Sequence, residues 1–236
     1  MNIDKTLNQI AEISLKKSAI IAGICLLLMA IIAPIANFAI IQNLIDPNDV
    51  AKTVSNITES NGLFRLGISL FMIVALLDIL VAWALYVFLK PINKNLSLLT
   101  AWLRIVYSTI LLVVLINLIN VLQLLNGADY LSVFTADQLQ TQVMLSLNIF
   151  THGFEFGLII FGFHLLLLGY MIFKAGYMRK ILGILIILAA LGYIIDGFAN
   201  LLSSDYNLSI SMYTFIGEVI LIFWLLIIGR KIKETN

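Results

Sequence analysis

Four ionisable side chains lie inside apolar stretches of this sequence, and their types could support chemistry. They are Asp78, His164, Asp196 and Glu218. A charged residue at the centre of a membrane helix costs about 2.5–3.5 kcal/mol on insertion scales, so such residues mark functional sites by default. We therefore expect these four side chains, the inner set, to face the interior of a helical bundle. There they would be protonated, paired or bound to a cation.

Helical rise divides the inner set into two layers. At 1.5 Å per residue, Asp196 and Glu218 lie about 10 Å below the outer boundary of the apolar region, whereas His164 and Asp78 lie about 18–21 Å below it. We expect a water-filled cleft, open to the outside, to link the layers.

A second histidine lies on the same apolar stretch as His164. His152 and Glu155 are three positions apart, so they can face one neighbour on a helix. Glu155 and His164 are nine positions apart and point to opposite sides at about 100° per residue. The spacing therefore predicts an entrance pair, His152 with Glu155, that is separate from the inner set.

Uncharged polar residues at helical spacing accompany these groups. The supporting positions are Asn117, Asn120, Tyr193 and Asn200. Hydrogen bonding between helices is the simpler use of such residues, and it contributes less than about 2 kcal/mol per contact.

The elements that must position these residues are membrane-spanning helices. The chain is 61% hydrophobic and 11% charged, with a mean hydropathy of +1.06, which leaves too little charge to cover a soluble domain. Apolar runs long enough to cross hydrocarbon recur along the chain. The predicted spans are 18–41, 64–89, 100–125, 150–173, 180–203 and 211–229. The fold class is thus all-α, with a single six-helix transmembrane domain (17–236) after a short amphipathic interfacial helix (1–16).

Basic residues cluster in alternate connections, which fixes the orientation. Pairs such as Lys16 with Lys17 and Lys90 with Lys94 flank spans on one side, and acidic residues such as Asp46 and Asp129 occupy the other. The positive-inside rule therefore places both termini in the cytoplasm of a multi-pass cell-membrane protein. The external connections are 42–63 and 126–149, and the second is expected to hold a surface helix leading into the fourth span.

Several classes of function are disfavoured by the sequence. The net charge of +1 and the lack of a basic block give no reason to expect a nucleic-acid partner. There is no phosphate-binding glycine loop, no nucleophile elbow and no His-Glu-x-x-His motif. We expect the lipid bilayer as partner and no organic cofactor. A bound cation or metal stays open, with His164, Asp196, Glu218 and Asp78 as candidate ligands, and so does oligomerisation.

Several segments resemble a known family. They are LFRLG (63–67), ALYVFLKPIN (84–93), FGFHLLLLGY (161–170), GYIID (192–196), GE (217–218) and WLLIIG (224–229). They are similar to an uncharacterised bacterial six-helix integral membrane family of the domain-of-unknown-function 4386 type. The resemblance implies architecture, with no activity attached, and it marks Arg65, His164, Asp196 and Glu218 as matching the family pattern. His152 and Glu155 are not part of that pattern.

Three functions fit these observations. The first is transport or binding of a proton, a cation or a small polar solute through the buried carboxyl and histidine groups. The second is an intramembrane metal-assisted lipid hydrolase. The third is a non-catalytic membrane sensor or assembly subunit, in which the polar groups only specify packing. Whether the protein is an enzyme stays open at this point.

Overall fold

The computed structural model describes residues 13–203, 205, 206 and 208–231 of the chain. Within these ranges the chain forms α-helices joined by short 3-10 and π segments, and no strand occurs. The predicted all-α fold is therefore confirmed. Of the predicted interfacial segment 1–16, residues 1–12 lie outside the described part. The first described helix begins at Leu15, with the Ser14 hydroxyl capping its first turn.

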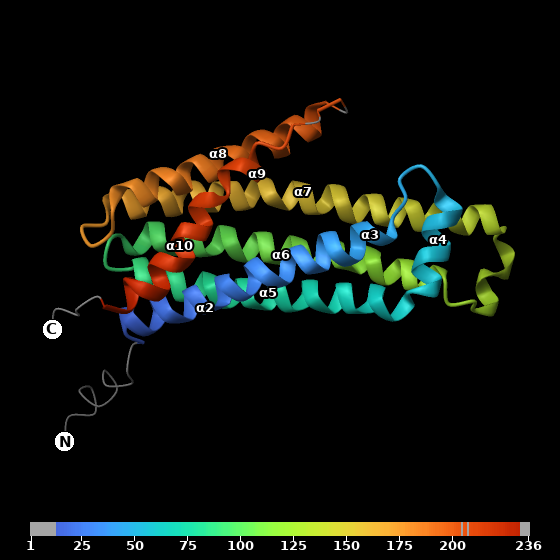
Figure 1. Ribbon diagram of the computed structural model, residues 1–236, viewed down its shortest axis with the longest axis horizontal. Helices are drawn as coiled ribbons and strands as arrows, with labels where there is room; N and C mark the ends of the chain where they lie inside the picture. The colour runs from blue at the N-terminus through green and yellow to red at the C-terminus, as the bar shows by residue number, and fades with distance from the viewer. Residues whose placement is uncertain (1–12, 204, 207, 232–236) are drawn as a thin grey trace, which may run out of the picture.

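Among the described residues, five helical stretches are long and apolar enough to cross a membrane; Figure 1 shows their arrangement. They are the continuous run Leu15–Leu44 (α2 Leu15–Pro34, π-helix η1 Ile35–Ile41 and α3 Gln42–Leu44), α5 (Asn61–Leu89), α6 (Lys94–Leu124), α7 (Ala136–Lys174) and α8 (Lys180–Leu202). The sixth predicted span is a shorter apolar stretch in two pieces, α9 (Ser211–Thr214) and α10 (Ile216–Ile227), followed by the 3-10 turn η3 (Gly229–Lys231). The architecture is thus roughly the expected six-helix bundle, with a short last member.

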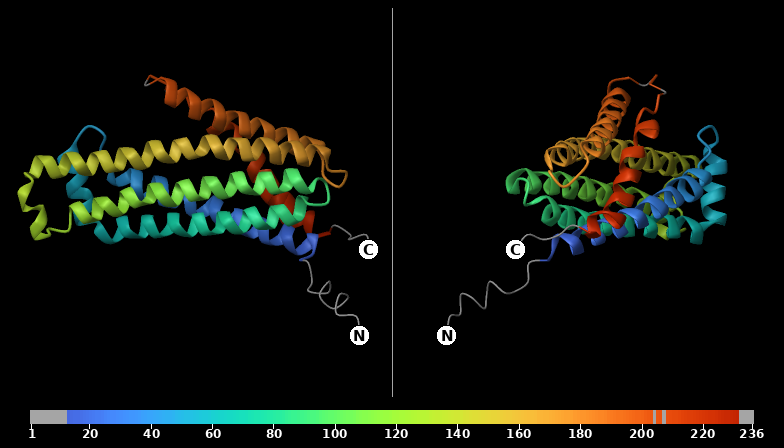
Figure 2. Two further views of the ribbon diagram at one scale, coloured as in Figure 1. Left: turned by 180° about the vertical axis from the view of Figure 1, so that it is seen from behind. Right: turned by 60° about the vertical axis from the view of Figure 1, so that its left-hand side comes forward.

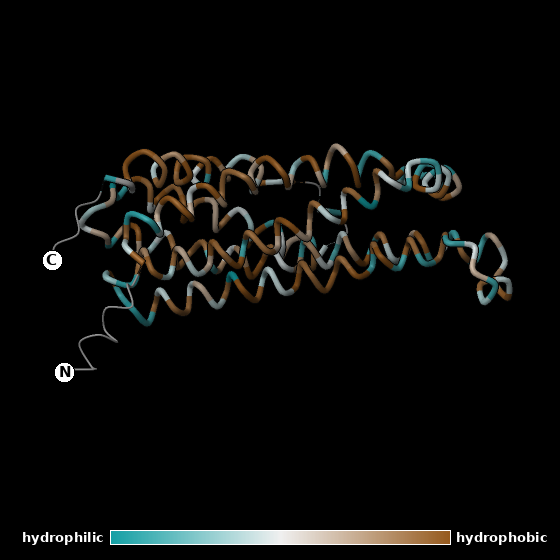
Figure 3. Tube along the Cα trace, turned by 90° about the horizontal axis from the view of Figure 1, so that it is seen from below, coloured by the Kyte–Doolittle hydropathy of each residue, from teal (hydrophilic) through white to brown (hydrophobic). Residues whose placement is uncertain are grey.

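Both ends of the described chain lie at the same end of the bundle, as an even number of crossings requires (Figures 1 and 2). We call this the inner end, following the charge pattern, and the opposite one the outer end. Hydrophilic residues concentrate at the two ends, and hydrophobic colouring dominates the helices between them (Figure 3).

The two connections at the outer end, 42–63 and 126–149, contain short helices of their own. The first contains α4 (Val50–Glu59), whose N-terminus is capped by Asp49 and which packs against α7. The second contains the 3-10 helix η2 (Asp129–Val133). Thr135 and Gln138 then form a capping box, each side chain accepting a hydrogen bond from the other residue's backbone N–H. The surface helix expected before the fourth span is the first part of α7 itself, which runs unbroken for 39 residues.

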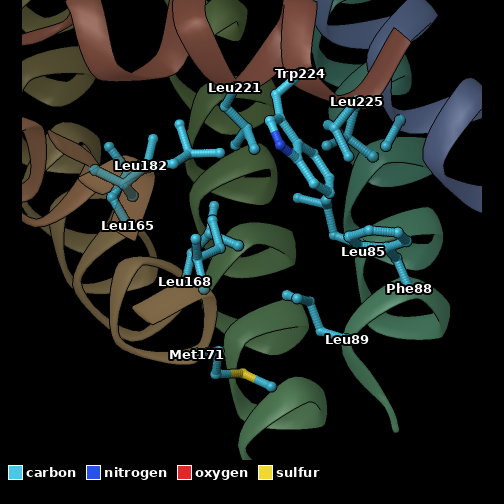
Figure 4. Packing of buried hydrophobic residues seen from close by; sticks show 14 of the residues in the cluster. Leu85, Phe88, Leu89, Leu165, Leu168, Met171, Leu182, Leu221, Trp224 and Leu225 are labelled. Carbon is cyan, nitrogen blue, oxygen red and sulfur yellow. The ribbon is translucent and has the colours of Figure 1, made fainter. Parts of the chain in front are cut away.

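The interior contains two apolar clusters, one toward each end. On α5 the outer cluster ends at Ala75 and the inner cluster begins at Val81, and Asp78 lies between them. The inner cluster includes leucines and Met171 from α5, α7 and α8 together with Trp224 of α10 (Figure 4). This apolar packing fills the bundle between the buried charged residues and the inner end.

Glycines bring α7 and α8 together at the inner end. A Cβ on Gly183 would lie 2.6 Å from the Phe173 backbone nitrogen and 2.7 Å from the Gly169 carbonyl oxygen. Close backbone approach of this kind is typical of small-residue contacts in membranes. Toward their outer ends the two helices diverge (Figures 1 and 2). The divergence leaves room near the outer end of α8.

Candidate functional site

Arg104 lies at the centre of the buried polar groups and joins three helices. Its Nε and Nη2 atoms contact Oδ1 of Asp78 at 2.8 and 2.6 Å, and its Nη1 lies 3.0 Å from Nε2 of His164. The Arg104 side chain is 2% exposed and that of Asp78 is 0% exposed. These residues come from α6, α5 and α7, so one guanidinium fixes the relative positions of three spans. The charge of Asp78 is balanced by direct contact, which makes its burial tolerable.

The hydrogen bonds around His164 assign its tautomer. Nδ1 is 2.8 Å from the carbonyl oxygen of Thr100, which can only accept, so Nδ1 carries the proton. Nε2 faces the guanidinium of Arg104, which can only donate, so Nε2 must be the unprotonated acceptor. His164 is therefore a neutral imidazole in this arrangement.

The Phe161 ring lies over the Arg104 guanidinium and is itself surrounded by other rings. Cζ of Arg104 lies 5.3 Å from the ring centroid of Phe161, a distance suited to a cation–π interaction. The same ring lies 5.7 Å from the His164 ring, 4.9 Å from Tyr107 and 5.4 Å from Tyr193. The Phe161 ring replaces water beside the charged group.

Two carboxyl oxygens in this region lack a hydrogen-bond partner among the described residues. They are Oδ2 of Asp78 and Oε1 of Glu218, and both are buried. A buried acceptor without a donor costs about 1–3 kcal/mol, and more when the group is charged. Either oxygen can be satisfied by a proton or by an ordered water.

Glu218 lies within electrostatic range of the charged centre. It interacts electrostatically with Tyr193, whose ring packs 5.4 Å from the Phe161 ring that lies over Arg104. Glu218 also interacts electrostatically with Arg104, Asp78 and Tyr107. The charged groups from α5, α6 and α10 therefore belong to one electrostatic network.

Asp196, the fourth member of the inner set, holds the connection between α8 and α9. Its Oδ1 accepts hydrogen bonds from the Tyr206 hydroxyl at 2.6 Å and from the Ile210 N–H at 3.0 Å, and its Oδ2 accepts from the Ser211 N–H at 2.7 Å. The hydrogen bond to Asp196 raises the pKa of Tyr206 to about 12, because it stabilises the protonated phenol. Asp196 thus anchors the outer connection to α8.

A cavity of about 260 Å³ lies beside Asp196 in the outer half of the bundle, and we call it the outer cavity. Residues 37–45 at the end of the first span, α7, α8 and the connection before α9 form its wall. The polar lining residues are Asn37, Gln42, Thr151, Glu155, Tyr193, Asp196, Asn200, Ser209 and Ser211. Tyr193 both lines this cavity and packs against Phe161, so it connects the cavity to the buried network.

The π-helix η1 contributes directly to the outer cavity. It follows Pro34, which lacks a backbone N–H and so cannot continue the α-helical hydrogen-bond pattern. Asn37, Phe38 and Ile41 of η1 line the cavity. Short π segments within helices often occur at functional sites.

One member of the entrance pair, Glu155, lies at the wall of the outer cavity, whereas His152 does not line it. His152 Nδ1 and Glu155 Oε2 are 3.4 Å apart, with side chains 79% and 35% exposed. Glu155 lines the outer cavity and also a smaller one of about 130 Å³, which His152 and Asn200 line as well. Glu155 therefore separates two adjacent openings.

Three other predicted positions lie apart from the outer cavity. The Asn117 amide donates to the Val114 carbonyl oxygen, and the Asn120 amide donates to the Ser146 hydroxyl. Arg65 is exposed, and its Nε donates to Asn61. It precedes Asp78 by about 20 Å along α5 at 1.5 Å per residue, so it does not join the inner set.

Metal ligation finds little support in this geometry. In the part of the chain that the structure describes, no group of three or more His, Cys, Asp or Glu residues could hold a metal ion. Of the four candidate ligands, Asp78 and His164 both bind the Arg104 guanidinium. That guanidinium takes the position that a shared metal ion would need.

Arg104 and Tyr107 belong to the buried network, yet sequence reasoning did not assign them to the site. The signal for Arg104 was present, because an arginine inside an apolar span must find an anion or a cavity. With Arg65, Arg104 was one of two arginines within the predicted spans, too few to neutralise four carboxylates, so it was not assigned to any one of them. Tyr107 follows Arg104 by three positions and carries no sequence signal of its own.

Comparison with known proteins places the chain in a family. The family model for the domain of unknown function DUF4386 matches residues 21–229. An uncharacterized protein of Archaeoglobus fulgidus is 40% identical over 168 residues, which cover 71% of this chain and 86% of that protein. No solved structure matches the chain. The match spans the bundle and the residues around Arg104, and the chain therefore belongs to the DUF4386 family.

Proposed function

We propose that this protein is a membrane transporter that accepts a small cation or polar solute in the outer cavity and exchanges protons through Glu218. The observation that carries the proposal is the double role of Tyr193, which lines the outer cavity and whose ring packs against Phe161, the ring that lies over Arg104. Tyr193 also interacts electrostatically with Glu218, so a solute in the cavity and a proton on Glu218 would influence each other through this residue.

Glu218 is suited to carry the proton. Its Oε1 is buried and has no donor among the described residues, so protonation removes a negative charge that no hydrogen bond to this oxygen stabilises. Ionisable groups of this kind mark proton pathways in transport proteins.

The shape of the bundle supports an outward-facing state. The outer cavity lies in the half where α7 and α8 diverge (Figure 2). The inner half is filled by the apolar cluster around Leu168 and Trp224 (Figure 4). Transport would require a second state in which this inner packing opens, as in alternating access.

The test is a flux assay on the full chain in lipid vesicles that contain a trapped pH-sensitive dye. A membrane potential is imposed, and proton entry is compared for wild type, Glu218→Gln and the control Glu59→Gln, which changes an exposed residue of α4. We expect proton entry in wild type and in the control, and at least a tenfold loss in Glu218→Gln.

Two results would contradict the proposal. One is wild-type protein that moves no proton and none of the common monovalent cations. The other is a folded Glu218→Gln variant, monodisperse in detergent, with unchanged flux. Either result would favour the sensor or assembly role instead.

A further inference from the structure

The charge of the outer cavity points to a cationic ligand. Glu155 and Asp196 are among its lining residues, and none of them is Lys, Arg or His. An anion in this cavity would face two carboxylates without a counter-charge. A cation would gain from both.

Only one of these carboxylates is available to a ligand. Asp196 already accepts three hydrogen bonds, from Tyr206, Ile210 and Ser211. Among the described residues, the one hydrogen-bond or ion-pair partner of the Glu155 carboxylate is the exposed His152, at 3.4 Å, which is beyond ordinary hydrogen-bond length. The cavity therefore offers one free negative charge and matches a ligand with one positive charge.

The apolar part of the lining favours an organic cation over a metal ion. Phe38, Phe150, Phe154 and Tyr193 line the cavity, and aromatic faces attract ammonium groups. Phe38 and Leu208 also form an apolar rim, with 62% and 68% of their surfaces exposed. A hydrated metal ion gains little from such a rim, whereas an ammonium ion with alkyl groups buries apolar surface there.

The volume limits the size of this ligand. The outer cavity measures about 260 Å³. At about 30 Å³ per water molecule this is room for about nine waters, which is less than typical drug-sized pockets offer. The amides of Asn37, Gln42 and Asn200 supply acceptors for the N–H groups of a small amine.

From these observations we infer that the outer cavity binds a small organic ammonium ion, with Glu155 as its counter-charge and the aromatic residues Phe150 and Phe154 around its alkyl part. The inference rests on the proposed function only in taking the outer cavity as the solute site.

Binding is tested by calorimetry on the purified full chain with n-butylammonium chloride. Butyrate, n-butanol and sodium chloride at equal ionic strength serve as anionic, neutral and inorganic comparisons. We expect saturable binding of butylammonium alone. Glu155→Gln should weaken it by about tenfold or more, because the counter-charge is removed while the side-chain size is kept.

Two control variants separate the role of Glu155 from general effects. His152→Gln removes the weak partner of Glu155 and should leave the affinity for butylammonium unchanged or slightly higher. Glu59→Gln removes an exposed charge on α4 and should change nothing. Thermal unfolding in detergent checks that each variant is folded.

The inference is overturned if sodium chloride, n-butanol or butyrate binds as well as butylammonium, or if folded Glu155→Gln keeps wild-type affinity. Its failure is distinguishable from failure of the proposed function. Proton flux that depends on Glu218 without butylammonium binding overturns this inference alone. Binding that depends on Glu155 in a protein without flux supports the inference and contradicts transport.

Discussion

Arg104 contacts a single oxygen of Asp78 with two of its nitrogen atoms, at 2.8 Å from Nε and 2.6 Å from Nη2. The third nitrogen is thereby free to bond His164 at 3.0 Å. The arrangement leaves the other Asp78 oxygen, Oδ2, buried without a donor among the described residues. Arg104 thus stabilises two neighbours at once and does not use the usual two-oxygen pairing with a carboxylate.

Loss of Arg104 should destabilise the bundle strongly. Arg104→Met leaves Asp78 as a buried charge without its counter-ion, which typically costs about 3–5 kcal/mol. Thermal unfolding in detergent measures the effect. The double variant Asp78→Leu/Arg104→Met removes both charges and should recover a large part of that loss. Equal stability of Arg104→Met and wild type would contradict the central role of this residue.

Gly183→Ala tests the contact between α7 and α8. The new Cβ would lie 2.6 Å from a backbone nitrogen and 2.7 Å from a carbonyl oxygen, and backbone atoms cannot rotate away. We expect a loss of about 1–3 kcal/mol, as for other overpacked sites. Gly62→Ala, on α5, is the matched control, because a Cβ at this position would have no neighbouring atom within 4 Å. It should leave the unfolding temperature unchanged or slightly raised, and a similar loss in both variants would argue against close packing at Gly183.

The hydrogen bond between Tyr206 and Asp196 should be visible in the pH dependence of stability. The pKa of Tyr206 is raised to about 12 in the folded state, against about 10 for a free phenol. A raised pKa means that the stabilising contribution is complete below pH 10 and is lost as the pH rises through about 12. Unfolding of wild type and Tyr206→Phe is compared between pH 8 and pH 12.

The difference in unfolding free energy between wild type and Tyr206→Phe should decrease from pH 8 to pH 12. Lysine titration affects both equally, so it cancels in the comparison. A difference in stability that stays constant with pH would mean that the Tyr206 hydroxyl does not donate to Asp196.

Periodicity and hydropathy predict the long apolar helices, because an apolar helix in lipid has few alternatives, but they did not predict α4 in the first connection. Depth counted along the helices placed Asp78 and His164 in one layer, and in the structure both contact Arg104. The same count did not reveal Arg104 as their link. The angular positions of residues around each helix also could not show that the Asp196 carboxylate accepts hydrogen bonds from the backbone N–H groups of Ile210 and Ser211.

The outer cavity could not be predicted from local sequence. Its lining combines residues of the π-helix η1, of α7 and α8, and of the connection before α9. How these segments pack together is a tertiary feature, which local sequence does not show. The entrance pair was inferred from spacing alone, and spacing cannot show that Glu155 faces a cavity shared with Asp196.

The length of α7 has a consequence for studies on intact cells. At 1.5 Å per residue, 39 residues extend for about 58 Å, nearly twice the thickness of membrane hydrocarbon. Its first turns must therefore stand in water beyond the lipid, where Thr141 is exposed. A cysteine introduced at this position should react with thiol reagents that do not cross membranes, against little background, because the natural Cys25 is buried. Such labelling would reveal directly on which side of the membrane the first turns of α7 lie.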